Sequence, residues 1–428
     1  MVAQQAKKNY ALPIAMMFAL FFMISFVTGL QNPMGVIVKN QFAIQNWQSQ
    51  LGNFANFIAY AFMGIPAGIL LKRVGYKKTA LLAIAVGFIG VGITFLSGIA
   101  ESFSVYLTGA FVAGFSMCML NAVVNPMLNT LGGEGKKGNQ LIQLGGSINS
   151  IGATIVPVLG GYLMGDVAKA TIKNAEPALF LAMGIFALAF IVLYFVSIPE
   201  PHMHLGENKA VKKEKDKYSP MSFRHFVLGT VAIFLYVGIE VGIPNIANLF
   251  MTNELAIDAT IAGSVVGTYW FLMMIGRFCG AAVGAKISSK AMLTFVSVLG
   301  MIFVAVAILT PETVKVDMPV FRSDISFGFA EVPLSIMFLI LCGLCTSIMW
   351  GGIFNLAVEG LGKYTAMASG IFMVMVCGGG VLPLIQGGVA DVAGYINSYW
   401  VIFVSMAFLL YYALIGCKNV NKNIPVED

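Results

Sequence analysis

The sequence predicts an all-α membrane protein with twelve transmembrane helices in two six-helix halves. Three observations support this fold class: 58% of the 428 residues are hydrophobic, only 10% are charged, and the apolar residues form twelve long runs. A soluble domain carries about 25% charged residues, so this chain has too few charges to cover a surface that faces water. Most of its surroundings are therefore expected to be lipid.

Each apolar run has about the length of a membrane-spanning helix, which needs ~20 residues. The runs lie at residues 12–38, 50–71, 79–99, 103–131, 140–164, 178–198, 226–252, 260–285, 291–310, 333–358, 365–388 and 395–416. The first run is too long for a signal peptide and lacks a small-residue cleavage site, so we expect it to be retained. The six cysteines lie in apolar stretches and are interpreted as packing residues rather than as a disulfide framework.

The longest polar stretch, residues 199–220, separates the sixth run from the seventh. It predicts an N-terminal half (1–198), a cytoplasmic linker (199–225) and a C-terminal half (226–428). With both termini in the cytoplasm, 20 of the 25 Lys and Arg residues lie on the cytoplasmic side, as the positive-inside rule requires. We therefore expect a multi-pass protein of a bacterial inner membrane. Because the basic residues sit in loops between spans, the net charge of +6 does not indicate a nucleic-acid partner.

The two halves resemble each other in sequence. PVLGGYLMGDV (157–167) closes the fifth run and PLIQGGVADV (383–392) closes the eleventh, each with a proline, paired glycines and an aspartate. Two parallel six-helix halves are similar to the layout of major facilitator transporters, which bind substrate at the midplane between the halves. A polytopic scaffold would not explain this duplication.

The predicted spans contain few residues that could catalyse a reaction. The only histidines, His202, His204 and His225, lie in or beside the polar stretch, so no H-E-x-x-H pair falls within a span. We find no glycine-rich phosphate loop and no Ser-His-Asp set. We therefore expect no enzyme and no cofactor.

Carboxamides are plentiful at membrane depth. The spacing of Asn121, Asn125 and Asn129 puts all three on one helix face. A carboxamide both donates and accepts hydrogen bonds, as a sugar hydroxyl does, and an indole ring offers a flat face to sugar C–H groups. The candidate substrate-binding residues are Asn32, Asn121, Asn125, Gln143, Asn149, Trp270, Trp350 and Asn355. The alternative for each amide is a hydrogen bond that only joins two helices.

Glu240 lies near the centre of an otherwise uncharged run from Val227 to Met251. Three hypotheses compete: a structural acid, a proton carrier, and a Na⁺ ligand. Pro244 leaves the carbonyl of Glu240 without its helical donor, which would supply a second oxygen ligand and a hinge. An acid without a Lys or Arg partner in its own span costs about 2.5–3.5 kcal/mol on insertion scales. This cost favours a coupling role over a structural one, with H⁺ or Na⁺ as the cation.

Three further residues are predicted to act in gating or structure: Pro244, Asn245 and Arg277. Arg277 lies in IGRFCG, past the middle of the eighth span toward the cytoplasm, and is expected to brace a gate or loop. No Lys or Arg is central to a span, so an anionic substrate is not expected. The basic turn LLKRVGYKK (70–78) is interpreted as a determinant of topology.

The chain resembles the fucose–galactose–glucose symporter family. The resemblance is carried by IPAGILLKRVGYKK (65–78), LNAVVNPMLNTLG (120–132), NSIGA (149–153), IGRFCG (275–280) and residues 353–394, in this order and spacing. It implies uptake of sugar by alternating access, driven by protons and in some members by sodium.

Several positions depart from the fucose-type pattern of that family. An Asp of span one and a Glu of span four are replaced by Asn32 and Asn121, neither of which can carry a proton. A Gln of span five becomes Gly146, while the nearby Asn is kept as Asn149. In span seven the fucose-type Gln is replaced by Glu240, as in glucose/galactose-type relatives. The resemblance therefore favours the glucose/galactose branch.

We therefore expect a monomeric secondary active transporter in lipid that takes up a neutral monosaccharide such as glucose, galactose or fucose. Coupling to H⁺ or Na⁺ is expected to run through Glu240. Two alternatives stay open: a sugar uniporter without ion coupling, and a permease or exporter for another neutral solute. A sugar sensor would need a long added cytoplasmic domain, for which the polar stretch and the short tail leave no room.

Overall fold

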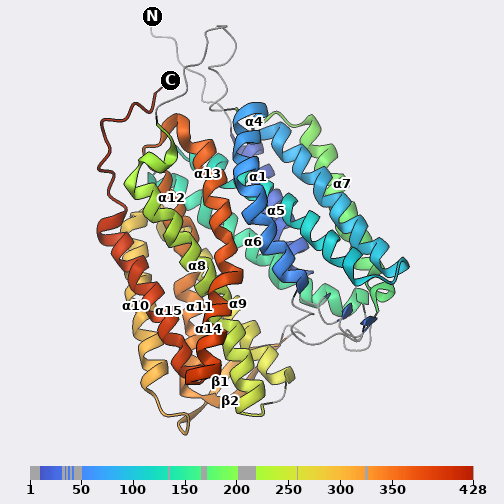
Figure 1. Ribbon diagram of the computed structural model, residues 1–428, viewed down its shortest axis with the longest axis vertical. Coiled ribbons are helices and arrows are strands. Elements are labelled where there is room, and N and C mark those ends of the chain that lie inside the picture. The colour runs from blue at the N-terminus through green and yellow to red at the C-terminus, as the bar shows by residue number, and fades with distance from the viewer. Residues whose placement is uncertain are drawn as a thin grey trace, which may run out of the picture.

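The computed structural model describes residues 10–30, 34, 37–38, 41–42, 51–133, 135–164, 171–200, 218–257, 259–322 and 326–427. Their helices form two bundles that stand side by side, here called the N-lobe and the C-lobe (Figure 1). The helices of the N-lobe are α1 (Ala11–Gly29), α4 (Leu51–Ile99), α5 (Phe103–Leu131), α6 (Gly135–Met164) and α7 (Ile172–Phe195).

Helix α4 contains two of the predicted spans. It runs for 49 residues but breaks at Gly75, whose φ of 87° is a conformation that favours glycine. Directly after the break, the carboxylate of Glu200 accepts hydrogen bonds from the backbone N–H groups of Tyr76 (2.6 Å) and Lys77 (3.0 Å). An anionic side chain there satisfies amide groups that the start of a helix leaves without partners. The Gly75 turn therefore folds the second and third spans back on each other and fixes the end of α7 beside them.

The C-lobe contains more and shorter elements. They are η1 (Pro220–Ser222), α8 (Arg224–Leu249), the π-helical η2 (Phe250–Glu254), α9 (Ala259–Gly284), α10 (Ser289–Leu309), α11 (Leu334–Thr346), α12 (Met349–Val358), η3 (Gly362–Tyr364), α13 (Thr365–Val374), η4 (Met375–Cys377), α14 (Gly378–Ala393), α15 (Tyr395–Tyr411) and the π-helical η5 (Tyr412–Gly416). Two predicted spans are each divided: the tenth into α11 and α12, and the eleventh into α13, η4 and α14. Membrane helices are interrupted in this way where the freed backbone groups find partners inside the protein.

A β-hairpin adds to the predicted all-helical fold. Strands β1 (Lys315–Phe321) and β2 (Phe327–Pro333) pair antiparallel between α10 and α11, with Met318 opposite Ala330. The backbone N–H of Phe321 donates to the hydroxyl of Thr268 on α9 at 2.8 Å, and the ring of Phe321 stacks on Phe271. The hairpin is therefore attached to α9.

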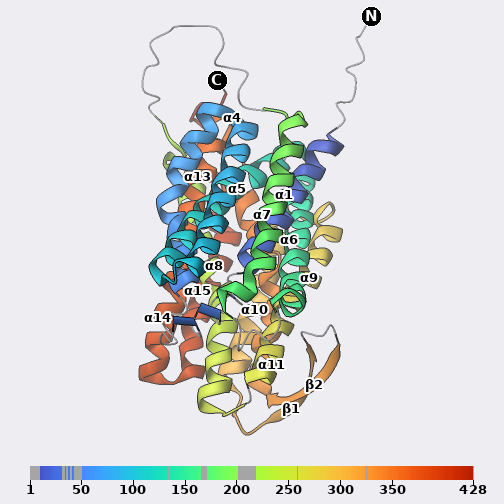
Figure 2. The ribbon, with the colours of Figure 1, turned by 90° about the vertical axis from the view of Figure 1, so that its right-hand side faces the viewer.

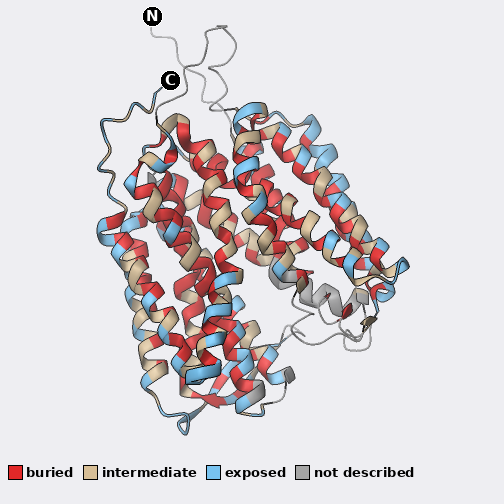
Figure 3. Cartoon of the chain, in the orientation of Figure 1, coloured by how far each residue is buried: buried red, intermediate tan, exposed pale blue. Residues whose placement is uncertain are grey.

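The predicted fold class is confirmed. Among the described residues, ten stretches are long and apolar enough to cross a membrane, and one of them, Phe54–Ile99, is the doubled helix α4. Helix α6, with 30 residues, lies on the remaining predicted span. Figure 3 shows exposed residues along the outer faces of both lobes, and many of these are large apolar side chains such as Phe195 and Leu309. The boundaries of the halves at 198 and 226 stay a prediction.

The end of the molecule where α8 begins and where the C-terminal tail lies is called the terminal end. There the backbone N–H of Arg224, at the start of α8, donates to Asn421 of the C-terminal tail, and the N–H of Lys363 donates to the carbonyl of Val426. Figure 2 places the hairpin at the opposite end of the molecule. The lobes meet where α6 packs on α9 and α12, and where α4 packs on α13. A methyl group on Gly370 of α13 would lie 2.6 Å from the carbonyl oxygen of Gly64 on α4, so those two backbones touch.

Candidate substrate site between the two lobes

Of the amides that were predicted on one face of α5, Asn125 reaches the C-lobe. Asn121 donates to the hydroxyl of Tyr60 on α4 at 3.2 Å, and Asn125 donates to the backbone carbonyl of Asn121 at 2.9 Å. The oxygen Oδ1 of Asn125 then accepts a hydrogen bond from the indole Nε1 of Trp350 on α12 at 3.0 Å. A chain of polar groups therefore begins in the N-lobe and crosses to the C-lobe.

Trp350 lies in an aromatic setting at this crossing point. Its ring meets the ring of Tyr236 on α8 at 6.2 Å and that of Phe372 on α13 at 6.1 Å, both edge to face. Trp350 and Asn121 stay partly exposed, whereas Asn125 is completely buried. The partly exposed residues of this group, Trp350 and Asn121, offer an aromatic ring and a carboxamide.

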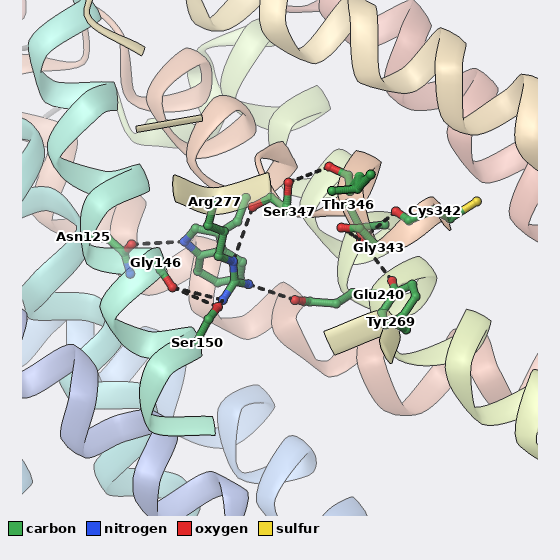
Figure 4. A network of polar contacts seen from close by, with 12 residues as sticks. Asn125, Gly146, Ser150, Glu240, Tyr269, Arg277, Cys342, Gly343, Thr346 and Ser347 are labelled. Carbon is green, nitrogen blue, oxygen red and sulfur yellow. Dashed lines mark hydrogen bonds and ion pairs between the residues drawn. The ribbon is translucent and has the colours of Figure 1, made fainter. Parts of the chain in front are cut away.

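The second polar group is centred on Arg277 of α9. Its Nη2 lies 3.1 Å from a carboxylate oxygen of Glu240 on α8, and its Nη1 donates to the hydroxyl of Ser150 (2.7 Å) and the carbonyl of Gly146 (3.2 Å) on α6. Its Nε donates to the carbonyl of Ser347 at 3.4 Å. Figure 4 shows the guanidinium between these groups, with α6 on one side and α8 on the other. Arg277 therefore holds a C-lobe acid and N-lobe oxygens at the same time.

The break in the tenth span supplies part of both polar groups. Between α11 and α12, Ser347 and Ile348 leave the helix, with Ile348 at φ −103° and ψ −4°. The freed carbonyl of Ser347 accepts from Arg277, and the carbonyl of Ile348, which also accepts from the backbone N–H of Gly352, accepts from Gln143 of α6 at 2.9 Å. Interrupted helices near the midplane often mark substrate or ion sites in transporters. Trp350 follows this break by two residues. The break therefore lies between Trp350, with its aromatic neighbours, and the ion pair of Glu240 and Arg277.

The charges of this site cancel. The side chains of Glu240 and Arg277 are 15% and 13% exposed, so both are largely withdrawn from solvent but not sealed. The other polar groups named above are amides, hydroxyls and carbonyls. Such a set can exchange hydrogen bonds with a neutral solute in both directions, because it contains donors and acceptors.

The remaining candidates lie at different places. Asn149 donates to the carbonyl of Phe21 on α1 within its own lobe, and the buried Asn355 donates to Ser289 of α10. These two bonds join neighbouring helices. Trp270 is 39% exposed and shares a face of α9 with Arg277, about 10 Å farther from the terminal end by the rise of 1.5 Å per residue.

The other predicted gating residues lie on α8. Pro244 is buried inside the helix, where it cannot donate to the carbonyl of Glu240. The carbonyl of Ile243, just before this proline, accepts from the hydroxyl of Tyr399 at 2.9 Å. Asn245 is exposed. Asn32 lies outside the described residues.

Sequence reasoning did not pair Glu240 with Arg277. Glu240 has no Lys or Arg partner in its own span, but Arg277 of the next long helix, α9, forms an ion pair with it. The physical reason is reach: the long Arg side chain carries its charge several ångströms from its backbone position, so residue counting misplaces the guanidinium. The predicted bracing role of Arg277 in a gate stays a prediction.

Sequence reasoning also missed Tyr60, Ser150 and the carbonyl of Ser347. A weak signal existed for Ser150, because residues 139, 143, 146 and 150 follow helical spacing along one face of α6 and two of them are amides. No pattern in the sequence points to the carbonyl.

Comparison with known proteins agrees with this architecture. The family model described as Major Facilitator Superfamily matches residues 17–382. A glucose/galactose transporter of Brucella abortus is 30% identical over 427 residues, which cover 97% of this chain and 96% of the relative. A putative glucose/galactose transporter of Helicobacter pylori is 28% identical, covering 96% of this chain and 98% of its own length.

More distant relatives include an L-fucose-proton symporter of Escherichia coli, 22% identical over 91% of this chain and 89% of the relative. The crystal structure of the transporter FucP in the outward conformation matches with a TM-score of 0.79 at 21% identity, over 94% of this chain and 98% of that one. These relatives confirm the predicted resemblance to the fucose, glucose and galactose branch. The chain is thus a multi-pass membrane transporter that belongs to the Major Facilitator Superfamily.

Proposed function

We propose that this protein is a secondary active transporter that takes up a neutral monosaccharide, such as glucose, galactose or fucose, by alternating access. The observation that carries the proposal is the pairing of Asn125 with Trp350, which brings a carboxamide of one lobe and an aromatic ring of the other to one place. A sugar needs both, since its hydroxyls exchange hydrogen bonds with amides and its C–H face packs on an aromatic ring. The names of the relatives support the same substrate class.

The charge of the site supports a neutral substrate. Glu240 neutralises Arg277 at 3.1 Å, so neither an anionic nor a cationic solute gains a net opposite charge there. The relatives that are named for glucose and galactose match more closely than those named for fucose, which favours an aldohexose.

Coupling to a cation is proposed to run through Glu240. A proton on this carboxyl would cancel its charge and weaken the bond to Arg277. A Na⁺ ion needs several oxygen ligands, and the oxygens near Glu240 on Ser150, Gly146 and Ser347 are the ones that Arg277 already holds. Sodium would therefore have to displace the guanidinium, whereas a proton would not. Either cation changes how firmly Arg277 joins the two lobes.

The proposal includes a location and an orientation. The excess of Lys and Arg on one side of the predicted spans supports a bacterial cytoplasmic membrane with both termini in the cytoplasm, in which case the terminal end is the cytoplasmic end. A monomer is sufficient, because the site is formed within one chain.

The test is uptake of radiolabelled monosaccharides into proteoliposomes, with a Na⁺ gradient and a proton gradient imposed in separate experiments. We expect one gradient to drive accumulation of a neutral hexose. In Glu240→Gln, accumulation should disappear while exchange of labelled for unlabelled sugar remains. Accumulation of the sugar by Glu240→Gln at the wild-type level would refute the coupling role. A wild type that exchanges sugar but never accumulates it would be a uniporter.

A further inference from the structure

Gln143 was a candidate for substrate binding, but it is buried, with 2% of its surface exposed, inside the contact between the lobes. It lies on α6 of the N-lobe, and its Nε2 donates to the carbonyl of Ile348 in the C-lobe at 2.9 Å. That carbonyl also accepts from the backbone N–H of Gly352 at 3.2 Å. The side-chain amide therefore adds a second bond to a group that α12 already satisfies, and the added bond crosses from lobe to lobe.

Two glycines of the C-lobe shape the space around this side chain. A methyl group on Gly351 of α12 would lie 2.7 Å from Nε2 of Gln143, closer than such contacts occur, and 3.1 Å from Ile142, which is a tight contact. A methyl group on Gly280 of α9 would collide with Ile348 and stand 3.7 Å from Oε1 of Gln143. Gln143 thus fills a slot between α9 and α12 that is open because Gly351 lacks a side chain, and the missing side chain at Gly280 makes room for Ile348, whose carbonyl Gln143 binds.

The slot lies on the terminal side of the Arg277 contacts and level with Trp350, which precedes Gly351 on α12. Along α6, Gln143 comes before Gly146 and Ser150, which contact Arg277, and α6 begins at the terminal end. One turn closer to that end, the buried Asn139 donates to the sulfur of Met292 on α10 at 3.6 Å. On the other side of the interface, Ser369 of α13 donates to the carbonyl of Ala122 on α5 at 3.1 Å. The bond from Gln143 is the shortest of these three.

We propose that Gln143, seated in the Gly280–Gly351 slot, is the residue that locks the terminal-end gate, and that it is not a ligand of the sugar. Alternating access requires α6 to separate from α9 and α12 when this end opens, so the Gln143 bond must break in every transport cycle. The inference rests on the two-lobe motion of the proposed function but on no particular sugar. When the lobes close again, the slot also fixes the register of α6 against the broken tenth span.

The prediction concerns four variants. Gln143→Met keeps the volume of the side chain and removes its hydrogen bond, and Gly351→Ala fills the slot. The double variant combines Gly351→Ala with Gln143→Ala, which leaves space for the new methyl group. Gly352→Ala is the matched control on the same helix, because a methyl group there meets only ordinary contacts at 3.7 and 3.8 Å.

The measurement is amide hydrogen exchange of the purified full chain in nanodiscs without sugar, followed in peptides from the terminal halves of α6 and α9. Loss of one net hydrogen bond shifts the opening equilibrium about fivefold, corresponding to about 1 kcal/mol. We expect Gln143→Met and Gly351→Ala each to speed exchange there by about this factor. Amide hydrogen exchange in the double variant should be slower than the two single-variant effects added together predict. Exchange in Gly352→Ala should match that of the wild type.

Transport supplies the second readout. In exchange experiments, Gln143→Met should keep the wild-type half-saturation for sugar, since the residue contacts no substrate, while the maximal rate changes. Unchanged hydrogen exchange in Gln143→Met would overturn the lock. Faster exchange throughout α10 and α15 as well would also overturn it, because that result would mean general destabilisation. A protein whose variants show the expected amide hydrogen exchange but which transports no hexose would refute the proposed function and leave the lock in place.

Discussion

The ion pair between Glu240 and Arg277 makes a quantitative prediction. Its nitrogen and oxygen atoms lie 3.1 Å apart with side chains 13% and 15% exposed, so removing one partner leaves a largely buried charge. Breaking a buried pair costs about 3–5 kcal/mol. Arg277 keeps three hydrogen bonds to neutral oxygens, so the lost contact is closer to one charged hydrogen bond, about 2 kcal/mol.

The expected shift in melting temperature follows from the size of the chain. Unfolding entropy of about 2.1 cal/mol/K per residue gives about 0.9 kcal/mol/K for 428 residues, so about 2 kcal/mol corresponds to about 2 °C. We expect Glu240→Gln and Arg277→Gln each to include this loss. The double variant should melt about 2 °C higher than the sum of the single shifts predicts, because the pair is lost only once.

The assay is thermal unfolding of detergent-solubilised protein, with all variants scanned at one rate. The control is the exposed pair of Lys315 and Glu331 on the hairpin, 3.0 Å apart with side chains 61% and 62% exposed, whose double variant should be additive. Additive shifts for Glu240 and Arg277 would refute the reasoning, since they would show that the pair contributes no more than a surface contact.

Two other variants separate substrate contacts from helix contacts. Trp350→Phe keeps an aromatic ring but removes the hydrogen bond to Asn125, so the half-saturation for sugar in exchange experiments should rise about five- to tenfold, and an unchanged value would remove this pair from the site. Asn355→Ala breaks the 2.8 Å bond to Ser289 and should lower the melting temperature by about 1 °C at unchanged half-saturation; altered sugar affinity would show that Asn355 does reach the substrate.

The spans could be predicted from sequence because each one must be apolar over its whole length. The turn between the second and third spans was also readable, since its basic residues mark a loop and Gly75 allows the reversal. The break at Ser347 and Ile348 was not, because Leu334–Val358 is apolar enough as a whole to be taken for one continuous span. The β-hairpin was missed for a different reason: burial alternates along it, with Met318 and Val320 inside and Asp317 exposed, over too few residues to stand out.

The site was only half accessible to sequence reasoning. Asn125 and Trp350 were each recognised by residue type, but their contact depends on how the two lobes dock, which no local pattern encodes. Glu240 and Arg277 lie on different helices and were assigned separate roles. Gln143 shows the limit most clearly, since an amide for sugar and an amide for a neighbouring helix look the same until the glycines opposite it are known.

Glu200 has a consequence for how the lobes are connected. Its carboxylate is fixed to the Gly75 turn of the N-lobe. On the C-lobe side Phe223 is fully buried against Tyr364, next to Arg224, whose backbone N–H is held by Asn421. Each lobe therefore holds its own end of the connection through contacts within that lobe. The described contacts between the lobes include those of α6 with α9 and α12 and of α4 with α13. A chain that is cut between residues 200 and 218 is therefore expected to assemble through those surfaces.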